Sequence, residues 1–283
     1  MIFPNEPQTA RDVSIHYDEL DRAYRDIWGE HVHHGYWVSG RESPAEAAEA
    51  LVRLVAERLE VAPGQALCDI GCGYGATAGW LAQNRQAKVT GFTISEAQAA
   101  IGRARAETMA GLAIFCRDWL DNGLPAAGFD RAYAIESSEH MVDKPRFFAE
   151  AARVLRPGGR LVVCAWLATE QPTPWEVRHL LEPICREGRL PSMGRRSDYE
   201  AMAAEAGFSL LRYDDISRNV ARTWAICLRR TLVRLFSDRG LRRLVLNRTT
   251  RNRSFLLSLP RLLWALRGGA MRYGVFVWEK RAA

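Results

Sequence analysis

The stretch Ala66-Leu67-Cys68-Asp69-Ile70-Gly71-Cys72-Gly73-Tyr74-Gly75 decides the fold. Residues 66–70 form a short apolar run typical of a buried strand. The glycines that follow let the backbone turn tightly and approach a ligand where a Cβ would collide. Their spacing, G-x-G-x-G with an acid two residues before the first glycine, differs from the G-x-G-x-x-G of dinucleotide-binding proteins, although Ala76 occupies a place where that pattern sometimes accepts alanine. Spacing alone therefore leaves a nucleotide-binding oxidoreductase open.

Apolar runs alternate with helical patterns on both sides of this turn. Ser43-Pro44-Ala45-Glu46 predicts a capping box with proline at the first helical position, and the helix runs to about Leu59. We predict further helices over 76–83, 96–109 and 145–155, and strands over 88–92, 112–116, 131–135, 161–166, 210–216 and 275–279. This alternation predicts βαβ units, an α/β fold with a mostly parallel sheet and helices on both faces.

Composition excludes several classes of protein. The chain has 283 residues, 48% of them hydrophobic, which excludes general disorder and fits one large α/β domain with an appendage or two small domains. The longest apolar stretches are broken, as at Pro260-Arg261, well short of the roughly 20 residues of a membrane span. The N-terminus lacks the basic start and apolar core of a secretory signal. Six scattered cysteines without a C-x-x-C pair favour a reducing cytoplasm over a zinc ribbon or a disulfide framework.

Charge is concentrated in one late segment of the chain. The formal net charge is +6, but residues 218–272 hold 14 arginines and a single acid, Asp238, and so carry +13. The same segment contains Trp224, Phe255 and Trp264 among many leucines. Basic and aromatic residues together predict a binding surface.

The pattern Asp69-x-Gly71-x-Gly73-x-Gly75 resembles motif I of class I S-adenosylmethionine-dependent methyltransferases. Three further blocks, residues 26–37, 91–98 and 136–144, resemble the γ-tocopherol methyltransferase family, which includes alkaloid N-methyltransferases and other natural-product enzymes. The resemblance implies a Rossmann-like fold with a seven-stranded, mostly parallel sheet. It divides the chain into a helical N-terminal lid (1–42), a cofactor-binding core (43–217), a basic helical insertion on the acceptor side (218–272) and the last core strand (273–283).

The resemblance also implies a set of residues that bind S-adenosylmethionine. The glycines would pack under its methionine part, Asp69 would order the turn and reach the ammonium through water, and Asp118 would accept a hydrogen bond from the adenine amino group. Thr93 ends the second strand where many methyltransferases have an acid, so Ser95 and Gln98 are expected to bond the ribose, while Ser95 is equally suited to cap the next helix. The full expected set is Tyr17, Asp69, Gly71, Gly73, Gly75, Thr93, Ser95, Gln98, Asp118, Trp119 (stacking on adenine) and Glu136. Core packing is the alternative for Tyr17.

His140 is the candidate catalytic residue. The family carries a histidine here that faces the acceptor, and an unperturbed pKa near 6.5 suits a general base. The alternative is a structural bond to a backbone carbonyl, with Glu136 or Glu139 orienting the ring in the catalytic case. No metal is expected at His31, His33 and His34, because zinc sites recruit further ligands at recognisable spacing. These histidines fall instead in the lid, where Trp28, His34, Tyr36 and Trp37 would help close the cofactor pocket.

The basic insertion allows three interpretations. A helix over 223–236 is expected to put its apolar side chains, Trp224, Cys227, Leu228, Thr231, Leu232, Leu235 and Phe236, on one face and its arginines elsewhere. It would then be a cap with a solvated arginine face, a lid over a lipophilic acceptor that rests on an anionic membrane surface, or a site for an anionic substrate such as a diphosphate. Nucleic-acid binding is not expected, because no accessory module for it is present.

The predicted function is methyl transfer to a carbon, nitrogen or oxygen of a small lipophilic natural product, such as a tocopherol-like phenol, a terpenoid or an alkaloid. One alternative is O- or N-methylation of a polar glycoside or amine. An alternative of another class is a protein that binds the cofactor but acts as a cyclase or partner protein.

Overall fold

The structure is a computed structural model that describes residues 1–247, 252, 254–255 and 258–282 of the chain. Arg248, Arg251 and Arg253 of the basic insertion lie outside the described residues.

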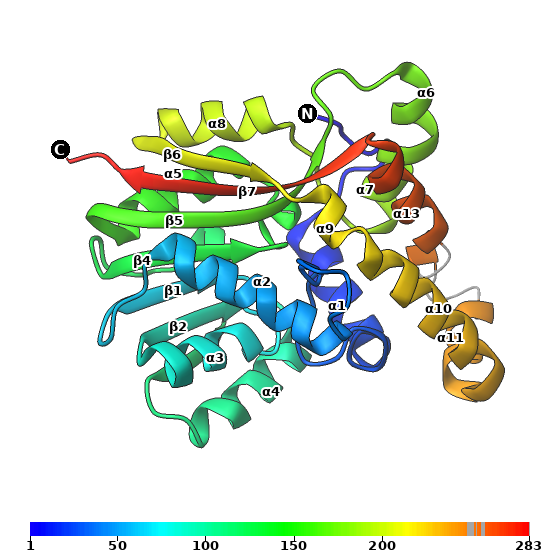
Figure 1. Cartoon of the computed structure of the whole chain (residues 1–283), viewed down its shortest axis with the longest axis horizontal. Coiled ribbons are helices and arrows are strands. Elements are labelled where there is room, and N and C mark those ends of the chain that lie inside the picture. The colour runs from blue at the N-terminus through cyan, green and yellow to red at the C-terminus, as the bar shows by residue number, and fades with distance from the viewer. Residues whose placement is uncertain (248–251, 253, 256–257, 283) are drawn as a thin grey trace.

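Seven strands form one sheet in the order β3-β2-β1-β4-β5-β7-β6 (Figure 1). Strand β7 runs antiparallel to both of its neighbours, β5 and β6, and the other pairs are parallel. The predicted seven-stranded, mostly parallel sheet is therefore confirmed. The strands are β1 (Ala66–Ile70), β2 (Lys88–Thr93), β3 (Leu112–Cys116), β4 (Phe129–Ile135), β5 (Leu155–Ala168), β6 (Phe208–Asp215) and β7 (Met271–Lys280).

Strand β7 is longer than its sequence pattern predicts. It begins at Met271, two residues before the expected boundary of the last core strand, because Met271 and Arg272 pair with Ala168 and Leu167 at the end of β5. Pairing with a neighbouring strand extends β7 beyond the apolar residues 275–279, and the pattern of those residues alone does not predict this extension.

Helices cover both faces of the sheet, as expected. Helices α2, α3 and α4 lie on one face, and α5 and α8 lie on the other (Figure 1). Each face has its own cluster of buried apolar side chains, built around Leu51 and Leu81 on the first and around Phe147 and Phe148 on the second. The helices are α2 (Pro44–Leu59), α3 (Ala76–Arg85), α4 (Glu96–Glu107), α5 (Lys144–Val154) and α8 (Arg196–Glu205).

Helix α2 begins where its capping signal predicts. Ser43 Oγ accepts the N–H of Glu46 at 3.3 Å, and the Glu46 carboxylate accepts the N–H of Ser43 at 2.7 Å. Both partners lie within one turn of chain, which is why the sequence alone predicts this contact. Several short elements are not among those predicted from the sequence: η1 (Trp119–Asp121), η2 (Ser138–His140), α6 (Pro174–Glu176), η3 (Val177–Leu181) and α7 (Glu182–Glu187). Of these, α6 begins with a capping box of the same kind, formed by Thr173 and Glu176, a signal that the sequence predictions overlooked.

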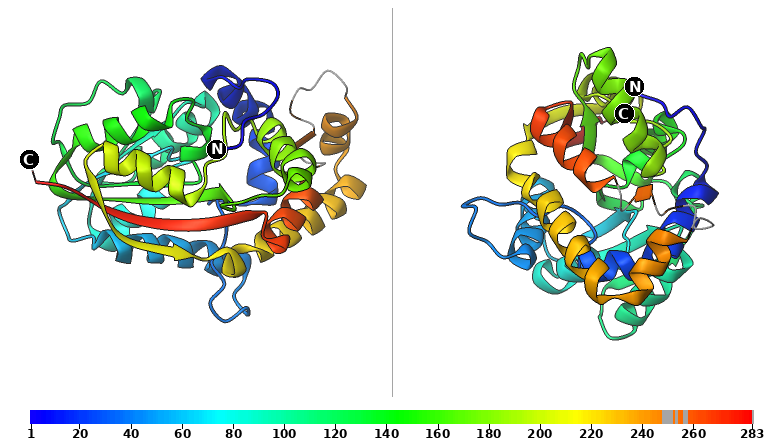
Figure 2. Two further views of the ribbon diagram at one scale, coloured as in Figure 1. Left: turned by 90° about the horizontal axis from the view of Figure 1, so that it is seen from above. Right: turned by 90° about the vertical axis from the view of Figure 1, so that its right-hand side faces the viewer.

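The N-terminal helix and the basic insertion meet at the carboxyl ends of the parallel strands. Helix α1 (Ala10–Ile27) lies beside α10 (Arg222–Ser237) there, together with α9 (Ser217–Val220), α11 (Arg239–Leu246) and α13 (Leu259–Gly268) (Figure 2). No helix in the part of the chain that the structure describes is long and apolar enough to cross a membrane.

Candidate active site

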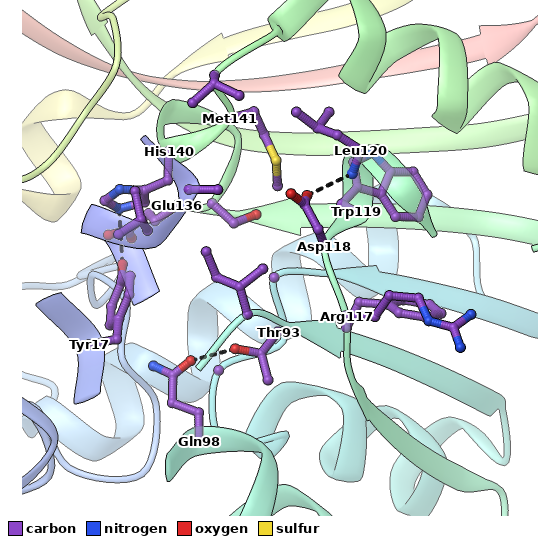
Figure 3. Close-up of a pocket in the computed structure, with 18 of the residues that line it drawn as sticks. Tyr17, Thr93, Gln98, Arg117, Asp118, Trp119, Leu120, Glu136, His140 and Met141 are labelled. Atoms are coloured by element: carbon purple, nitrogen blue, oxygen red, sulfur yellow. Dashed lines mark hydrogen bonds between the residues drawn. The ribbon is translucent and has the colours of Figure 1, made fainter. Parts of the chain in front are cut away.

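A main cavity of about 760 Å³ opens at the carboxyl ends of β1, β2 and β4 (Figure 3). Parallel strands of an open α/β sheet generally present their ligand sites at this edge. Most residues of the expected cofactor set line it: Tyr17, Gly71, Gly73, Thr93, Gln98, Asp118, Trp119 and Glu136, together with the candidate base His140.

The three glycines of the turn serve different purposes. All have positive φ angles, 84° at Gly71, 53° at Gly73 and 71° at Gly75. A Cβ on Gly71 would lie 2.3 Å from the Cβ of Ser137, whereas a Cβ on Gly73 would meet no protein atom within 4 Å. Gly71 is thus required for packing, and the missing side chain of Gly73 leaves room for a ligand. Gly75 sits at the start of α3, in contact with Ile114.

Beside the main cavity, a glycine-turn cavity of about 350 Å³ shares Gly71, Gly73 and Val32 with it. Asp69 lines this second cavity and accepts a 2.8 Å hydrogen bond from the Tyr133 hydroxyl. Burial raises the pKa of Asp69 to about 7, and the bond from Tyr133 only partly opposes that rise. A ligand ammonium here would stabilise the carboxylate.

Gln98 and Thr93 present a neutral polar group at the end of β2. The Thr93 hydroxyl donates to Gln98 Oε1 at 2.8 Å, which leaves the Gln98 amide nitrogen as a donor toward the cavity (Figure 3). Ser95 does not line the cavity: its hydroxyl donates to Asp18 of α1 at 2.5 Å and accepts the N–H of Gln98 at 3.1 Å. The structure confirms Ser95 as the N-cap of α4, and the bond to the ribose stays a prediction that the engaged hydroxyl does not favour.

Asp118 and Trp119 behave differently although they are adjacent. One Asp118 oxygen accepts the N–H of Leu120 at 2.9 Å, and no described residue bonds the other (Figure 3). The Trp119 ring packs against Phe92 and Phe147, and its N–H donates to the carbonyl of Phe147 at 3.3 Å. The ring therefore packs in the core at the edge of the main cavity, and its stacking on adenine stays a prediction.

Glu136 fastens the N-terminal lid to the sheet. Its Oε1 accepts bonds from the His34 N–H at 2.6 Å and the Tyr273 hydroxyl at 2.8 Å, and its Oε2 accepts bonds from His34 Nδ1 at 2.8 Å and Trp166 Nε1 at 3.1 Å. Burial alone would raise the pKa of Glu136, but the neighbouring His34 outweighs it and lowers that pKa. With four protein donors on its two oxygens, Glu136 lines the main cavity as a latch between the lid and the sheet, and its contact with the cofactor stays a prediction.

His140 is held between α1 and a backbone carbonyl. Its Nε2 lies 2.9 Å from the Tyr17 hydroxyl and its Nδ1 lies 3.4 Å from the carbonyl oxygen of Arg189. A proton on Nδ1 leaves Nε2 as an acceptor, and burial lowers the pKa of His140 to about 4, so the ring is neutral at pH 7. Among the described residues, Tyr17 and Arg189 orient the ring, and neither Glu136 nor Glu139 is bonded to it. Both of the roles considered for His140 are compatible with this geometry.

An aromatic cavity of about 450 Å³ adjoins the main cavity, and Tyr17, Val32, Glu136 and His140 line both. Its other walls are mostly large apolar side chains: Tyr24, Trp28, Trp166, Leu190, Trp224 and Phe255, with Gly188 and Glu139. The basic insertion thus contributes Trp224 and Phe255 to this wall.

The sequence did not predict that Glu139 and Trp224 line the aromatic cavity. Burial raises the pKa of Glu139 to about 7. The hydrogen bond that its carboxylate accepts from the backbone N–H of Trp166 at 2.6 Å lowers this pKa and so opposes part of the rise. Trp224 is 1% exposed, and its Nε1 has no hydrogen-bond partner in the described part of the chain. The sequence also missed two apolar residues of the main cavity, Leu120, which directly follows Trp119, and Met141, which lies within the matched block 136–144.

The histidine cluster belongs to the lid. His31 and His33 line the glycine-turn cavity. His31 Nδ1 and His33 Nε2 each lie 3.3 Å from the hydroxyl oxygen of Thr77. Burial lowers the pKa of His31 to about 3. Within the described ranges, no group of three or more His, Cys, Asp or Glu side chains is placed to hold a metal ion.

The lid closes the cavities with only some of the expected residues. Trp28 lines the aromatic cavity, and Val32 lines all three. The backbone N–H of Trp37 instead donates to the carbonyl of Asn219, and the carbonyl of Trp37 accepts a hydrogen bond from the Asn219 side chain. Neither Trp37 nor Tyr36 borders any of the three cavities.

These residues fit S-adenosylmethionine. The open space at Gly73 admits a ligand where a Cβ would stand, the unbonded oxygen of Asp118 suits an amino group, and the amide nitrogen of Gln98 suits a ribose oxygen. Asp69 at the far end suits an ammonium.

Comparisons with known proteins agree with this fit. Residues 5–236 match the family model described as mycolic acid cyclopropane synthetase. The chain is 35% identical over 245 residues to the O-methyltransferase cnsE of Penicillium expansum, which covers 84% of this chain and 83% of that protein. It is 29% identical over 291 residues to the chloroplastic tocopherol O-methyltransferase of Arabidopsis thaliana, with coverage of 95% and 82%.

The fold also matches that of the mycolic acid cyclopropane synthase CmaA1, solved in complex with SAH and CTAB. The TM-score is 0.86 at 20% identity, and the match covers 97% of this chain and 99% of that one. The resemblance drawn from the motifs is confirmed: the chain belongs to the mycolic acid cyclopropane synthetase family and is an S-adenosylmethionine-dependent methyltransferase.

Proposed function

We propose that this methyltransferase methylates a hydroxyl oxygen of a small lipophilic natural product that enters the aromatic cavity. The observation that carries this proposal is the shared wall of Tyr17, Glu136 and His140 between the main and aromatic cavities. A cofactor in the first cavity and an acceptor in the second would meet at His140. The names of the relatives, both O-methyltransferases, favour oxygen as the methylated atom.

The walls of the aromatic cavity indicate the chemistry of the acceptor. Tyr24, Trp28, Trp166, Trp224 and Phe255 offer flat apolar surface, which suits a planar or unsaturated molecule. No Arg or Lys is among the described residues that line it, so the structure offers no support for a diphosphate acceptor. The unpartnered Nε1 of buried Trp224 would be satisfied by an oxygen of the acceptor.

When bound, S-adenosylmethionine supplies an electrophilic methyl group on a sulfonium. The chain's task is to align the acceptor oxygen with that methyl group and to take up one proton. As the new O–C bond forms and the C–S bond breaks, the acceptor oxygen becomes strongly acidic. A histidine with a pKa of about 4 can therefore take up this proton at Nε2 through the Tyr17 hydroxyl, which gives its own proton to Nε2 as it receives that of the acceptor.

Turnover with labelled S-adenosylmethionine tests this proposal. We would screen lipophilic phenols, terpenoid alcohols, glycosides and amines, and would read the methylated atom from product mass spectra. His140→Ala should lower kcat by about 10²-fold or more. Its affinity for S-adenosylmethionine should stay close to that of the wild type. His179→Ala is the matched control, since His179 is exposed and borders none of the three cavities.

Full turnover by His140→Ala on the true acceptor would refute the proton-acceptor role. A product methylated at nitrogen or carbon would correct the oxygen assignment. Cofactor binding with no transfer to any acceptor would favour the cyclase or partner-protein alternative.

For location we propose the cytoplasm, because all six cysteines are free.

A further inference from the structure

Helix α10 is rotated relative to the expectation from its sequence. Trp224 and Cys227 are buried as expected, but Leu232 is 50% exposed and Phe236 is 86% exposed. Val233, between them on the same face, is 60% exposed. The expected single apolar face is therefore wrong for Leu232 and Phe236, whereas Thr231 is buried and Leu235 packs against the core as expected. Three large apolar side chains form an outward ridge: Leu232, Val233 and Phe236.

Arginine contacts on the inner side account for this rotation. Arg230 donates to the carbonyl of Ile27, at the C-terminal end of α1, and Arg234 pairs with Asp26 at 2.9 Å. The carbonyls at a helix C-terminus attract cations, and Asp26 adds a full negative charge. Since Arg230 and Arg234 occupy the inner face, the ridge faces solvent.

Unpaired arginines flank the ridge. Arg229, one turn before Leu232 and Val233, and Arg239, just after Phe236, are exposed, and no described residue bonds either guanidinium. The one acid of the insertion, Asp238, is engaged by the N–H groups of Gly240 and Leu241 and by Arg22. The surface around the ridge is therefore positive as well as apolar.

The ridge lies at the same end of the molecule as the aromatic cavity. The inner face of α10 supplies Trp224 to that cavity, and α10, α11 and α13 together form this end of the molecule (Figure 2). Helix α13, which packs against α10, adds Trp264, 60% exposed, with its ring 5.5 Å from that of Trp175. Exposed tryptophans of this kind suit the boundary between water and lipid.

We propose that the α10 ridge, Leu232, Val233 and Phe236 with Arg229 and Arg239, docks on the surface of an anionic lipid bilayer. An apolar helix face with arginines at its margins matches the two components of such a surface, the acyl boundary and the anionic headgroups. A bilayer would bring a membrane-dissolved acceptor to the aromatic cavity. This purpose rests on the proposed lipophilic acceptor, whereas docking itself does not require methyl transfer.

Co-sedimentation with vesicles tests the docking surface. The full chain should bind vesicles of equimolar phosphatidylcholine and phosphatidylglycerol in low-salt buffer, should bind phosphatidylcholine vesicles much more weakly, and should be released by high salt. Phe236→Ser should weaken binding by about ten-fold or more. Arg229→Gln and Arg239→Gln should each weaken it by about five-fold. Leu211→Ser, at a 49% exposed position on the edge strand β6, is the matched control and should leave binding unchanged.

Calorimetry with S-adenosylmethionine shows that each variant is folded and separates this proposal from the proposed function, since cofactor affinity should not change. Absence of binding to the anionic vesicles by a wild type that binds cofactor would overturn the docking surface. Equal binding by the wild type and Phe236→Ser would also overturn it. A wild-type dimer in light scattering that Phe236→Ser converts to a monomer would assign the ridge to a second copy of the chain instead.

Discussion

Replacing Glu136 by glutamine should destabilise the lid far more than a single isosteric change on the surface would. Each carboxylate oxygen of Glu136 accepts two hydrogen bonds, so the amide nitrogen that replaces one oxygen would face two donors whichever way the side chain turns. Hydrogen bonds to a charged group contribute about 1.5–3 kcal/mol each, so we expect Glu136→Gln to cost about 3–6 kcal/mol. That is a large part of the roughly 5–15 kcal/mol by which a domain is stable.

Urea unfolding at pH 7 followed by circular dichroism measures this loss, and hydrogen exchange at the His34 amide shows whether the lid opens locally first. Glu200→Gln is the matched control: Glu200 pairs with Arg196 at 2.6 Å on the surface of α8, and we expect a change of at most about 0.5 kcal/mol. A loss below about 1 kcal/mol in Glu136→Gln, with unchanged exchange at His34, would refute the latch.

The same latch has a pH dependence. The folded pKa of Glu136 is lowered, so its stabilisation is fully present above its ordinary pKa of 4.5 and is lost as the pH falls through the folded value. The wild type should therefore lose stability in acid more steeply than Glu136→Gln.

Three further changes test the cavities. Gly73→Asn should abolish S-adenosylmethionine binding in calorimetry while leaving the protein folded by circular dichroism, because asparagine tolerates the positive φ of this position and its side chain enters space that no protein atom occupies; retained affinity would contradict the placement of the cofactor. Between pH 7 and 5, wild-type affinity for S-adenosylmethionine should fall by up to about ten-fold per unit as Asp69, with a pKa of about 7, takes up a proton, and Asp69→Asn should show no such slope. Trp224→Phe keeps the apolar wall but removes the unpartnered N–H, so it should raise KM for the true acceptor by about five-fold or more; an unchanged KM would exclude Trp224 from acceptor binding.

Local signals predicted the elements that depend on near neighbours in the chain. The strand Ala66–Ile70 has the expected bounds, since its five residues are apolar or buried by the parallel strands on either side. The capping box of Ser43 and Glu46 formed for the same reason, because its partners are three residues apart. Motif spacing then placed Gly73 and Asp118 at one edge of the sheet, where both line the main cavity.

Side chains with two possible partners were not predictable in this way. Ser95 could cap α4 or bond the cofactor, and Asp18, 77 residues away, takes its hydroxyl hydrogen. Trp119 could stack on a ligand or join the core, and the carbonyl of Phe147 draws its N–H into the core. The orientation of α10 likewise follows from the pairing of Arg234 with Asp26, which the periodicity of α10 does not contain.

Calorimetric titration of S-adenosylmethionine into the wild type, Asp118→Asn and Asp121→Asn tests the placement of the cofactor in the main cavity most directly. Asparagine at position 118 keeps an oxygen for the Leu120 N–H but replaces the unbonded oxygen by an NH₂ group, which would face the adenine amino group. We predict one-site binding by the wild type, a loss of about ten-fold or more in Asp118→Asn, and no change in Asp121→Asn, whose side chain lies outside the cavity. No binding by the wild type, or equal affinity in all three proteins, would contradict the placement of the adenine amino group at Asp118.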